Sequence, residues 1–177
     1  MNAIFLDKDG TLIVDKDYSY KIEDIEFIPR AFQALKLLQE KNYNLFIITN
    51  QSGIAKGYFT KKDTEKQLDF IVKSLNKKGI KIQKYSYCPH SPEENCECRK
   101  PKTKMLDDLI KKYKINTKKS FVIGDKLTDI ETGKKLNIKT VLVMTGKTKK
   151  PINQKISPDF IAKDLYEASK IIANLKN

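Results

Sequence analysis

Residues 3–11 read AIFLDKDGT, and this stretch decides the fold of the chain. Residues 3–7 are a short apolar run that ends in an acid, which is typical of a strand buried on both faces of a parallel sheet. Gly10 follows, and glycine permits the unusual backbone angles of a tight turn. The sequence therefore predicts a buried strand whose end carries two carboxylates, those of Asp7 and Asp9.

Strands and helices alternate along the rest of the chain. Further strands are expected at residues 45–49, 82–87, 121–123 and 141–144. Helices are expected from Pro29, after a Thr60 cap, from Met105, from Ile130 and, beyond a polar loop at 147–158, over residues 162–175. This alternation predicts an α/β fold with a doubly wound, mostly parallel sheet.

Length and composition describe one domain. A chain of 177 residues, 40% of them apolar, fits a single domain over residues 1–177 with its own core. No apolar run approaches the roughly 20 residues needed to cross a membrane. Met1 leads directly into the first strand without the features of a signal peptide. We therefore expect a cytoplasmic monomer with no membrane partner.

The net charge of +13 has two interpretations. It indicates either an anionic partner, such as nucleic acid or a phosphorylated metabolite, or a lysine-rich solvated surface. The lysines are scattered along the whole chain, with no stretch in which aromatic residues alternate with them. We therefore favour the solvated surface and expect no nucleic-acid partner.

Acidic residues follow two of the expected strands. Asp7 and Asp9 come after the first strand, and Asp125 and Asp129 after the fourth. Ligands of such folds bind beyond the carboxyl ends of the strands, where these acids can meet. A carboxylate can act as a nucleophile in phosphoryl transfer, and Mg²⁺ can offset the negative charge. Each pair of acids alone is equally compatible with an ordinary turn. Their expected position at the same edge of the sheet favours a catalytic site.

All the cysteines and the single histidine lie in one short segment, as Cys88, His90, Cys96 and Cys98. Three thiolates and one imidazole make a closed tetrahedral Zn²⁺ set with no open position, which indicates a structural ion. Its expected task is to fix the loop that presents Arg99 and Lys100. The alternative is a nucleic-acid-binding zinc knuckle, but the loop is rich in Glu and lacks stacking aromatic residues.

Four motifs resemble, in order, those of the haloacid dehalogenase superfamily of phosphatases. DKDGTL at residues 7–12 resembles the first motif, Thr49 the second, Lys100 the third, and GDKLTD at 124–129 the fourth. The resemblance implies that Asp7 is the nucleophile and a Mg²⁺ ligand, and that Asp125 completes the metal site. It further implies that Asp9 is the general acid and base and binds Mg²⁺ through its backbone carbonyl. We expect a raised pKa for Asp9, because an acid must hold its proton at neutral pH.

The same resemblance implies roles around the phosphate. Thr49 and the amide of Asn50 would bind it, and Lys100 would offset charge on the transferring group. Asp129 would orient either Lys100 or a metal-bound water. The segments beside the site are too short for a large cap domain, so we expect loops at residues 14–26 and 51–59, with the zinc loop, to shape the pocket.

The zinc loop narrows the resemblance to two sister groups. CPH at 88–90 and CECRKP at 96–101 resemble the D-glycero-D-manno-heptose 1,7-bisphosphate phosphatases and the histidinol-phosphate phosphatases, both of which carry zinc there. TNQSGI at 49–54 favours the heptose group, with cleavage of the C7 phosphate, whereas KTKM at 102–105 is closer to the histidinol group. We favour the heptose substrate. The remaining alternatives are a basic zinc-loop protein that binds nucleic acid and a phosphatase of nucleic-acid ends.

A bisphosphate substrate requires a second anion site. Lys56, Arg99 and Lys126 are the candidates for it, and arginine can bind phosphate in a bidentate manner. For the two lysines, an ordinary surface position is equally compatible with the sequence. Ser52 and the amide of Gly53 are the candidate sugar contacts.

Overall fold

The computed structural model of the chain describes residues 1–146 and 156–175. Within them, the strands are β1 (Ala3–Leu6), β2 (Asn44–Asn50), β3 (Ile82–Cys88), β4 (Phe121–Gly124), β5 (Lys139–Val143) and β6 (Phe160–Ala162). The helices are α1 (Ala31–Glu40), α2 (Lys61–Asn76), α3 (Lys104–Tyr113), α4 (Leu127–Lys135) and α5 (Leu165–Asn174). Three short 3₁₀ turns are η1 (Ile22–Asp24), η2 (Pro92–Glu94) and η3 (Thr117–Lys119).

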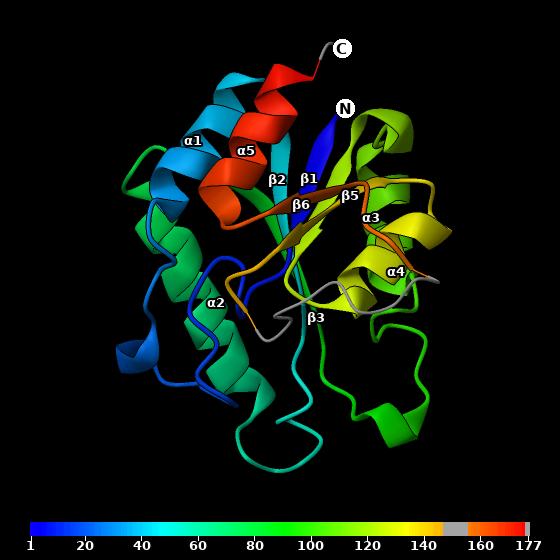
Figure 1. Ribbon diagram of the computed structural model, residues 1–177. Helices are drawn as coiled ribbons and strands as arrows, with labels where there is room; N and C mark the ends of the chain where they lie inside the picture. The colour runs from blue at the N-terminus through cyan, green and yellow to red at the C-terminus, as the bar shows by residue number, and fades with distance from the viewer. Residues whose placement is uncertain (147–155, 176–177) are drawn as a thin grey trace.

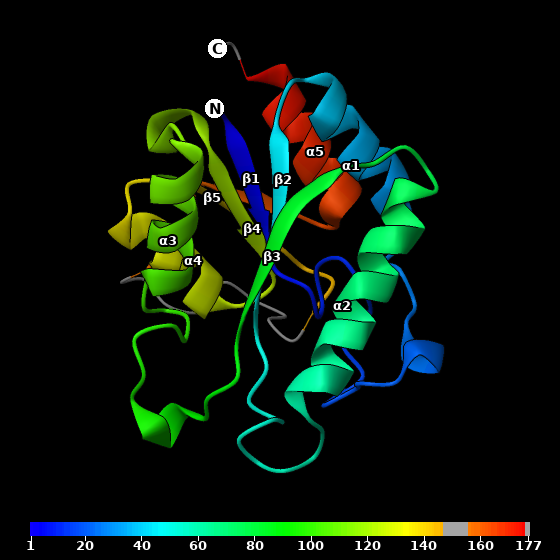
Figure 2. The same cartoon turned by 180° about the vertical axis from the view of Figure 1, so that it is seen from behind.

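The strands form one parallel sheet in the order β3-β2-β1-β4-β5-β6. Helices α1, α2 and α5 cover one face of the sheet, and α3 and α4 cover the other (Figure 1 and Figure 2). This arrangement confirms the predicted doubly wound α/β fold. Strand β1 lies inside the sheet with a hydrogen-bonded neighbour on either side, so the segment that carries Asp7 is held from both directions.

Each face of the sheet has its own apolar core. Ile4 packs into the cluster under α1, α2 and α5, whereas Phe5 packs into the cluster under α3. Because successive side chains of a strand point to opposite faces, a strand covered on both faces needs an unbroken apolar run. Phe5 is paired with Phe46 of β2, and their ring centroids lie 5.6 Å apart.

The strand register brings the ends of three strands to one edge. Leu6 of β1 is paired with Ile47 of β2 and with Ile123 of β4. The Asp7 N–H then donates to the carbonyl oxygen of Ile123 at 2.9 Å, which continues the pairing by one residue. The polar residues that follow β1, β2 and β4 therefore meet beyond the carboxyl edge of the sheet.

The C-terminal region corrects one expectation. A single helix was expected over residues 162–175, but Phe160–Ala162 forms the edge strand β6 and α5 begins only at Leu165. The Asp164 carboxylate caps α5 by accepting from the Glu167 N–H at 2.7 Å. Strand β6 is short and half exposed, and it leads almost directly into the helix, so its apolar residues resemble a helical pattern. Most of the loop expected at 147–158 lies outside the described residues.

The connections next to the site are short. Only η1 lies between β1 and α1, and only α2 lies between β2 and β3. The Thr60 hydroxyl accepts from the Asp63 N–H at 3.2 Å, and the Asp63 carboxylate accepts from the Thr60 N–H at 3.0 Å, so α2 starts with the expected capping box. Within the described residues, no helix has the length and apolarity that a membrane span requires.

Candidate active site

Two cavities that share lining residues lie beyond the carboxyl edge of the sheet. The inner cavity has a volume of about 30 Å³ and is bounded by Asp7, Thr49, Lys100 and Asp129. It is larger than the roughly 10–15 Å³ that one water needs. The outer cavity has a volume of about 260 Å³. The residues that line both cavities are Asp9, Asn50, Lys126 and Thr128.

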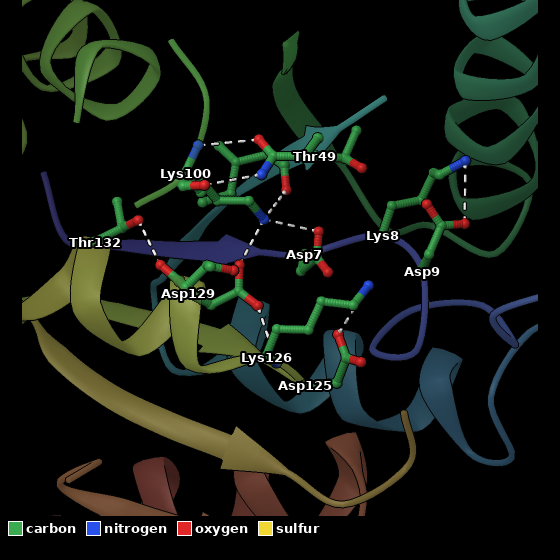
Figure 3. Close-up of polar contacts among 12 residues, drawn as sticks. Asp7, Lys8, Asp9, Thr49, Lys100, Asp125, Lys126, Asp129 and Thr132 are labelled. Atoms are coloured by element: carbon green, nitrogen blue, oxygen red, sulfur yellow. Dashed lines mark hydrogen bonds and ion pairs between the residues drawn. The ribbon is translucent and has the colours of Figure 1, made fainter. Parts of the chain in front are cut away.

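The Lys100 ammonium lies at the centre of the inner site. It is buried and contacts carboxylate oxygens of Asp7 at 2.8 Å and Asp129 at 2.5 Å (Figure 3). It also donates to the carbonyl oxygen of Ile48 at 3.1 Å. The Asn50 side chain holds the Lys100 backbone from both sides, accepting from its N–H at 3.0 Å and donating to its carbonyl oxygen at 3.1 Å. Asn50 thereby fixes the segment from which the lysine reaches the sheet edge.

The surrounding charges favour an ionised Asp7. Burial raises the pKa of Asp7, but the ammonium groups of Lys100 and Lys126 outweigh it and hold the pKa below its ordinary value. Burial lowers the pKa of Lys100, but the carboxylates of Asp129 and Asp7 outweigh it and raise the pKa above its ordinary value. Asp7 is thus a buried carboxylate that retains its negative charge, which is what a nucleophilic aspartate requires.

Two acids follow β4 as expected. The Asp125 side chain is fully buried and packs tightly against the backbone of Gly10, where an added Cβ would lie only 2.6 Å from its Oδ2. Gly10 has φ of +82°, an angle that also favours glycine. Asp129 is fully buried as well, and its Oδ2 accepts from the Lys126 N–H at 3.2 Å at the start of α4. Its other oxygen is thereby left to contact Lys100.

Three carboxylates fit a divalent cation. Oxygens of Asp7, Asp125 and Asp129 lie within 4.8 Å of one another, and all three residues are buried. Clustered buried carboxylates are costly without a cation, and hard oxygen ligands suit Mg²⁺. The sequence placed Asp7, Asp9 and Asp125 at the metal. The Asp9 carboxylate is not in this group, and the expected contribution of Asp9 through its backbone carbonyl stays a prediction.

Asp9 lies at the junction of the two cavities. Its Oδ1 is 3.2 Å from the Lys8 ammonium, and its Oδ2 accepts from Gln51 Nε2 at 3.0 Å. Burial raises the pKa of Asp9 above its ordinary value, although the Lys8 ammonium opposes the shift. The direction agrees with the expectation for a general acid.

Gln51 is a site residue to which no sequence motif assigned a role. Its amide nitrogen donates to Thr49 Oγ1 at 2.9 Å and to Asp9 Oδ2, so both amide hydrogens are used within the site. Gln51 is also buried, and its backbone N–H donates to the Cys88 carbonyl oxygen at 2.7 Å. The signal for Gln51 in the sequence is its place between Asn50 and Ser52, two candidate substrate contacts.

Four of the five remaining candidate substrate residues line the outer cavity, namely Ser52, Gly53, Arg99 and Lys126. Further lining residues come from the loop at 14–26, and no sequence motif marks them: Asp15, Asp17, Tyr18 and Ser19. Lys56 does not line the cavity, and its ammonium donates to the Tyr18 hydroxyl at 2.6 Å. Burial lowers the pKa of Lys126, but the carboxylates of Asp7 and Asp125 outweigh it and raise the pKa above its ordinary value.

The four candidate zinc ligands converge. Cys88 Sγ lies 3.6 Å from His90 Nδ1, 3.5 Å from Cys96 Sγ and 3.1 Å from Cys98 Sγ. Cys98 Sγ lies 3.3 Å from His90 Nδ1 and 3.6 Å from Cys96 Sγ, and all three cysteines are free thiols. These five distances are similar, and all four ligand atoms lie within 4.8 Å of one another, which suits the corners of a small tetrahedron such as a Zn²⁺ site requires.

The fold and the site define a phosphoric monoester hydrolase of the haloacid dehalogenase-like class. A family model described as HAD-hydrolase-like matches residues 97–168. A solved structure from B. bronchiseptica, a D,D-heptose 1,7-bisphosphate phosphatase complexed with magnesium and phosphate, superposes with a TM-score of 0.89 at 28% identity. The match covers 97% of this chain and 98% of that one.

Curated relatives narrow the class. A D-glycero-alpha-D-manno-heptose-1,7-bisphosphate 7-phosphatase of Campylobacter jejuni is 44% identical over 83% of this chain and 84% of its own length. A D-glycero-beta-D-manno-heptose-1,7-bisphosphate 7-phosphatase of Pasteurella multocida is 39% identical over 99% of this chain and 98% of its own. The chain belongs to the same family as these heptose-bisphosphate 7-phosphatases.

Proposed function

We propose that this protein hydrolyses the C7 phosphate of D-glycero-D-manno-heptose 1,7-bisphosphate in a Mg²⁺-dependent reaction. The observation that carries the proposal is the buried contact of Asp7 with Lys100 at the floor of a cavity that opens into a second, larger one. A nucleophile in the inner cavity and a polar outer cavity suit a phosphoryl group attached to a sugar. The names of the curated relatives supply the particular sugar.

The chemistry begins with Asp7. Its carboxylate attacks phosphorus, the bond between phosphorus and the sugar oxygen breaks, and Asp9 gives its proton to the departing oxygen. Asp9 then takes a proton from a water that attacks the aspartyl-phosphate, which releases inorganic phosphate and restores Asp7. The place of Asp9 at the junction of the cavities supports this role, because the breaking bond joins the phosphoryl group to the sugar.

Charge on the transferring group is offset by the residues of the inner cavity. The Lys100 ammonium, the Thr49 hydroxyl and the Asn50 amide would bind the phosphoryl oxygens, which carry most of the charge in the transition state. Asp7, Asp125 and the Asp9 carbonyl would hold Mg²⁺, which supplies further charge neutralisation when bound. Asp129 would orient Lys100, a role supported by their 2.5 Å contact.

The outer cavity supports a sugar bisphosphate. Arg99 and Lys126 provide cations for the second phosphate, while Ser52 and the Gly53 amide provide polar contacts for sugar hydroxyls. A volume of about 260 Å³ is slightly below the roughly 300–1,000 Å³ of typical small-molecule pockets. A compact cavity of this kind favours a single sugar over the end of a nucleic acid.

We further propose that Cys88, His90, Cys96 and Cys98 hold a structural Zn²⁺. Their close approach supports it, and the ion would fix the segment that leads into Arg99 and Lys100. The Arg99 guanidinium donates to the His90 carbonyl oxygen at 3.2 Å, which links this cluster to the outer cavity.

A phosphate-release assay with Mg²⁺ tests the function. The substrates are both anomers of the heptose 1,7-bisphosphate, histidinol phosphate and a 3′-phosphorylated oligonucleotide. We expect the highest kcat/KM with one of the heptose anomers and retention of its C1 phosphate in the product. Faster hydrolysis of histidinol phosphate would make that compound the substrate in place of the heptose bisphosphate. Negligible activity on all of these compounds would contradict the proposed phosphatase function.

A further inference from the structure

Lys8 lies between the two aspartates of the first motif, and its ammonium is buried. The side chain has no exposed surface. Burying a charged ammonium is unfavourable unless it is paired and hydrogen-bonded. Its partners are Asp9 Oδ1 at 3.2 Å and Gln67 Oε1 at 2.5 Å. Figure 3 shows Lys8 and Asp9 together, apart from the cluster that surrounds Lys100.

Gln67 connects this ammonium to a wall of the outer cavity. It lies on α2, 59 positions from Lys8, and only 1% of its surface is exposed. Its Oε1 accepts from Lys8, and its Nε2 lies 3.4 Å from the carbonyl oxygens of both Ser19 and Lys21. Ser19 lines the outer cavity. One buried amide thus joins the Lys8 ammonium to the loop that surrounds the sugar site.

Asp9 is held through both of its oxygens. Lys8 contacts Oδ1 from the side of α2, and Gln51 donates to Oδ2 from the end of β2. A carboxylate that touches one partner can rotate about its bonds, whereas contacts at both oxygens restrict its orientation. Proton transfer depends on such restriction, because the acid must lie within hydrogen-bond reach of the leaving oxygen.

We propose that Lys8 and Gln67 are positioning residues that hold the Asp9 carboxylate at the junction of the two cavities. Gln67 fixes the Lys8 ammonium, and Lys8 fixes the orientation of Asp9 against the breaking bond. This inference rests on the proposed function, in which Asp9 protonates the leaving oxygen. Neither residue lines the inner or the outer cavity.

Leaving-group dependence separates positioning from simple stability. An alkoxide leaves from a sugar phosphate only with a proton, whereas 4-nitrophenolate leaves readily without one. The value of kcat/KM reports the steps up to the first irreversible one, which here is phosphoryl transfer to Asp7. A misplaced Asp9 therefore lowers kcat/KM for the sugar phosphate and spares the aryl phosphate, while a general loss of folded enzyme lowers both equally.

The experiment compares Lys8→Met and Gln67→Met with wild-type protein on heptose 1,7-bisphosphate and 4-nitrophenyl phosphate. General acid catalysis contributes about 10²- to 10⁴-fold, so we expect a loss of about 30- to 100-fold on the sugar phosphate and less than about 3-fold on the aryl phosphate. Lys8→Arg, which keeps the charge, should recover part of the loss. Lys66→Met, at an exposed neighbour on α2, is the matched control and should change neither rate.

Gln67→Met keeps the ion pair of Lys8 with Asp9, so it tests the inference even where Lys8→Met does not fold. A crystal structure of Gln67→Met should show a displaced or disordered Asp9 carboxylate. Equal losses on both substrates, or no loss on either, would overturn the inference. The proposed function is tested by the rates of wild-type protein alone, without the variants. If wild-type protein prefers another alkyl phosphate, the proposed sugar is wrong, but the comparison of alkyl with aryl phosphate still tests the roles of Lys8 and Gln67. If wild-type protein hydrolyses no phosphate ester, both the proposed function and this inference are overturned.

Discussion

The Lys100 ammonium lies 2.8 Å from a carboxylate oxygen of Asp7, although 93 positions separate the two residues in the chain. The contact exists because Asn50, at the end of β2, binds both polar groups of the Lys100 backbone. A residue from a loop is thereby held against a residue that follows the first strand.

Asp7→Asn should abolish turnover. The amide keeps the shape of the side chain but is a poor nucleophile, so we expect kcat to fall by at least about 10³-fold. Wild-type protein quenched in acid during turnover should contain a phosphorylated peptide that includes Asp7, and the variant should not. Asp107→Asn, at an exposed position of α3, is the control and should retain activity. Normal turnover by Asp7→Asn would refute the covalent mechanism.

Lys100→Met should impair both activity and stability. It leaves the buried carboxylates of Asp7 and Asp129 without their ammonium, and breaking a buried pair in this way costs about 3–5 kcal/mol. Adding Asp129→Asn removes one of the two charges, so the double variant should be more stable than the sum of the single changes, with a coupling of about 0.5–3 kcal/mol. Urea unfolding in Mg²⁺-free buffer measures this cycle. Strict additivity would show that the ion pair is not coupled.

Cys98→Ser should remove the proposed zinc. We expect elemental analysis to find about one zinc per wild-type chain and much less in the variant. Loss of the ion should lower Tm by about 10 °C, which corresponds to roughly 3 kcal/mol for a chain of this size. Glu97→Gln, the residue next to it, breaks only an exposed ion pair with Lys102 and should change stability by less than about 1 kcal/mol. Wild-type protein without zinc would refute the proposal.

Arg99→Met should weaken binding of the second phosphate. We expect KM for the bisphosphate to rise by about 10- to 100-fold, since hydrogen bonds to charged groups contribute about 1.5–3 kcal/mol. The corresponding monophosphate, which lacks that group, should show a much smaller change. Lys102→Met is the control, because Lys102 follows in the same loop but does not line the outer cavity. Equal effects on both substrates would place the second phosphate elsewhere.

Asp159→Asn should destabilise the protein in a pH-dependent way. The Asp159 carboxylate accepts from the Thr140 N–H and hydroxyl at 2.8 Å and pairs with Lys134 at 2.7 Å. Burial raises the pKa of Asp159, but these partners outweigh it and hold the pKa below its ordinary value of 3.8. The stabilisation is therefore fully present above about pH 4 and is lost as the pH falls through the lower, folded-state value. We expect a loss of about 1 kcal/mol at pH 7 that shrinks as the pH falls below the ordinary pKa of 3.8. Urea unfolding at several pH values measures it, and a constant difference across the series would contradict the assignment.

Local patterns predicted most of the fold. The short apolar runs of β1, β2 and β4 are typical of strands covered on both faces, and the Thr60 cap marks the start of α2 within one residue. Strand β6 escaped prediction because three residues at a sheet edge carry too little pattern to separate them from the helix that follows. Its place depends on pairing with β5, which is a tertiary contact.

The sequence predicts those residues of the candidate site that directly follow the ends of strands, such as Asp7 and Asp125. Lys8 and Gln67 could not be found in this way. A lysine in a turn is usually exposed, and a glutamine on a polar helix is usually solvated. Their burial follows from the docking of α2 beside the first motif, which no local spacing reveals. Buried polar partners of a catalytic group are therefore the part of a site that requires coordinates.

Strand β1 is the interior strand on which Asp7 depends, and neighbours on both sides hydrogen-bond to it. The backbone that carries the nucleophile is therefore held by the sheet, and the residues that select a sugar lie on the loops around the outer cavity. Selection for a different sugar can act on those loops while the phosphoryl-transfer chemistry stays intact. A fixed catalytic strand surrounded by variable loops would let one fold act on different phosphorylated metabolites while the reaction mechanism stays the same.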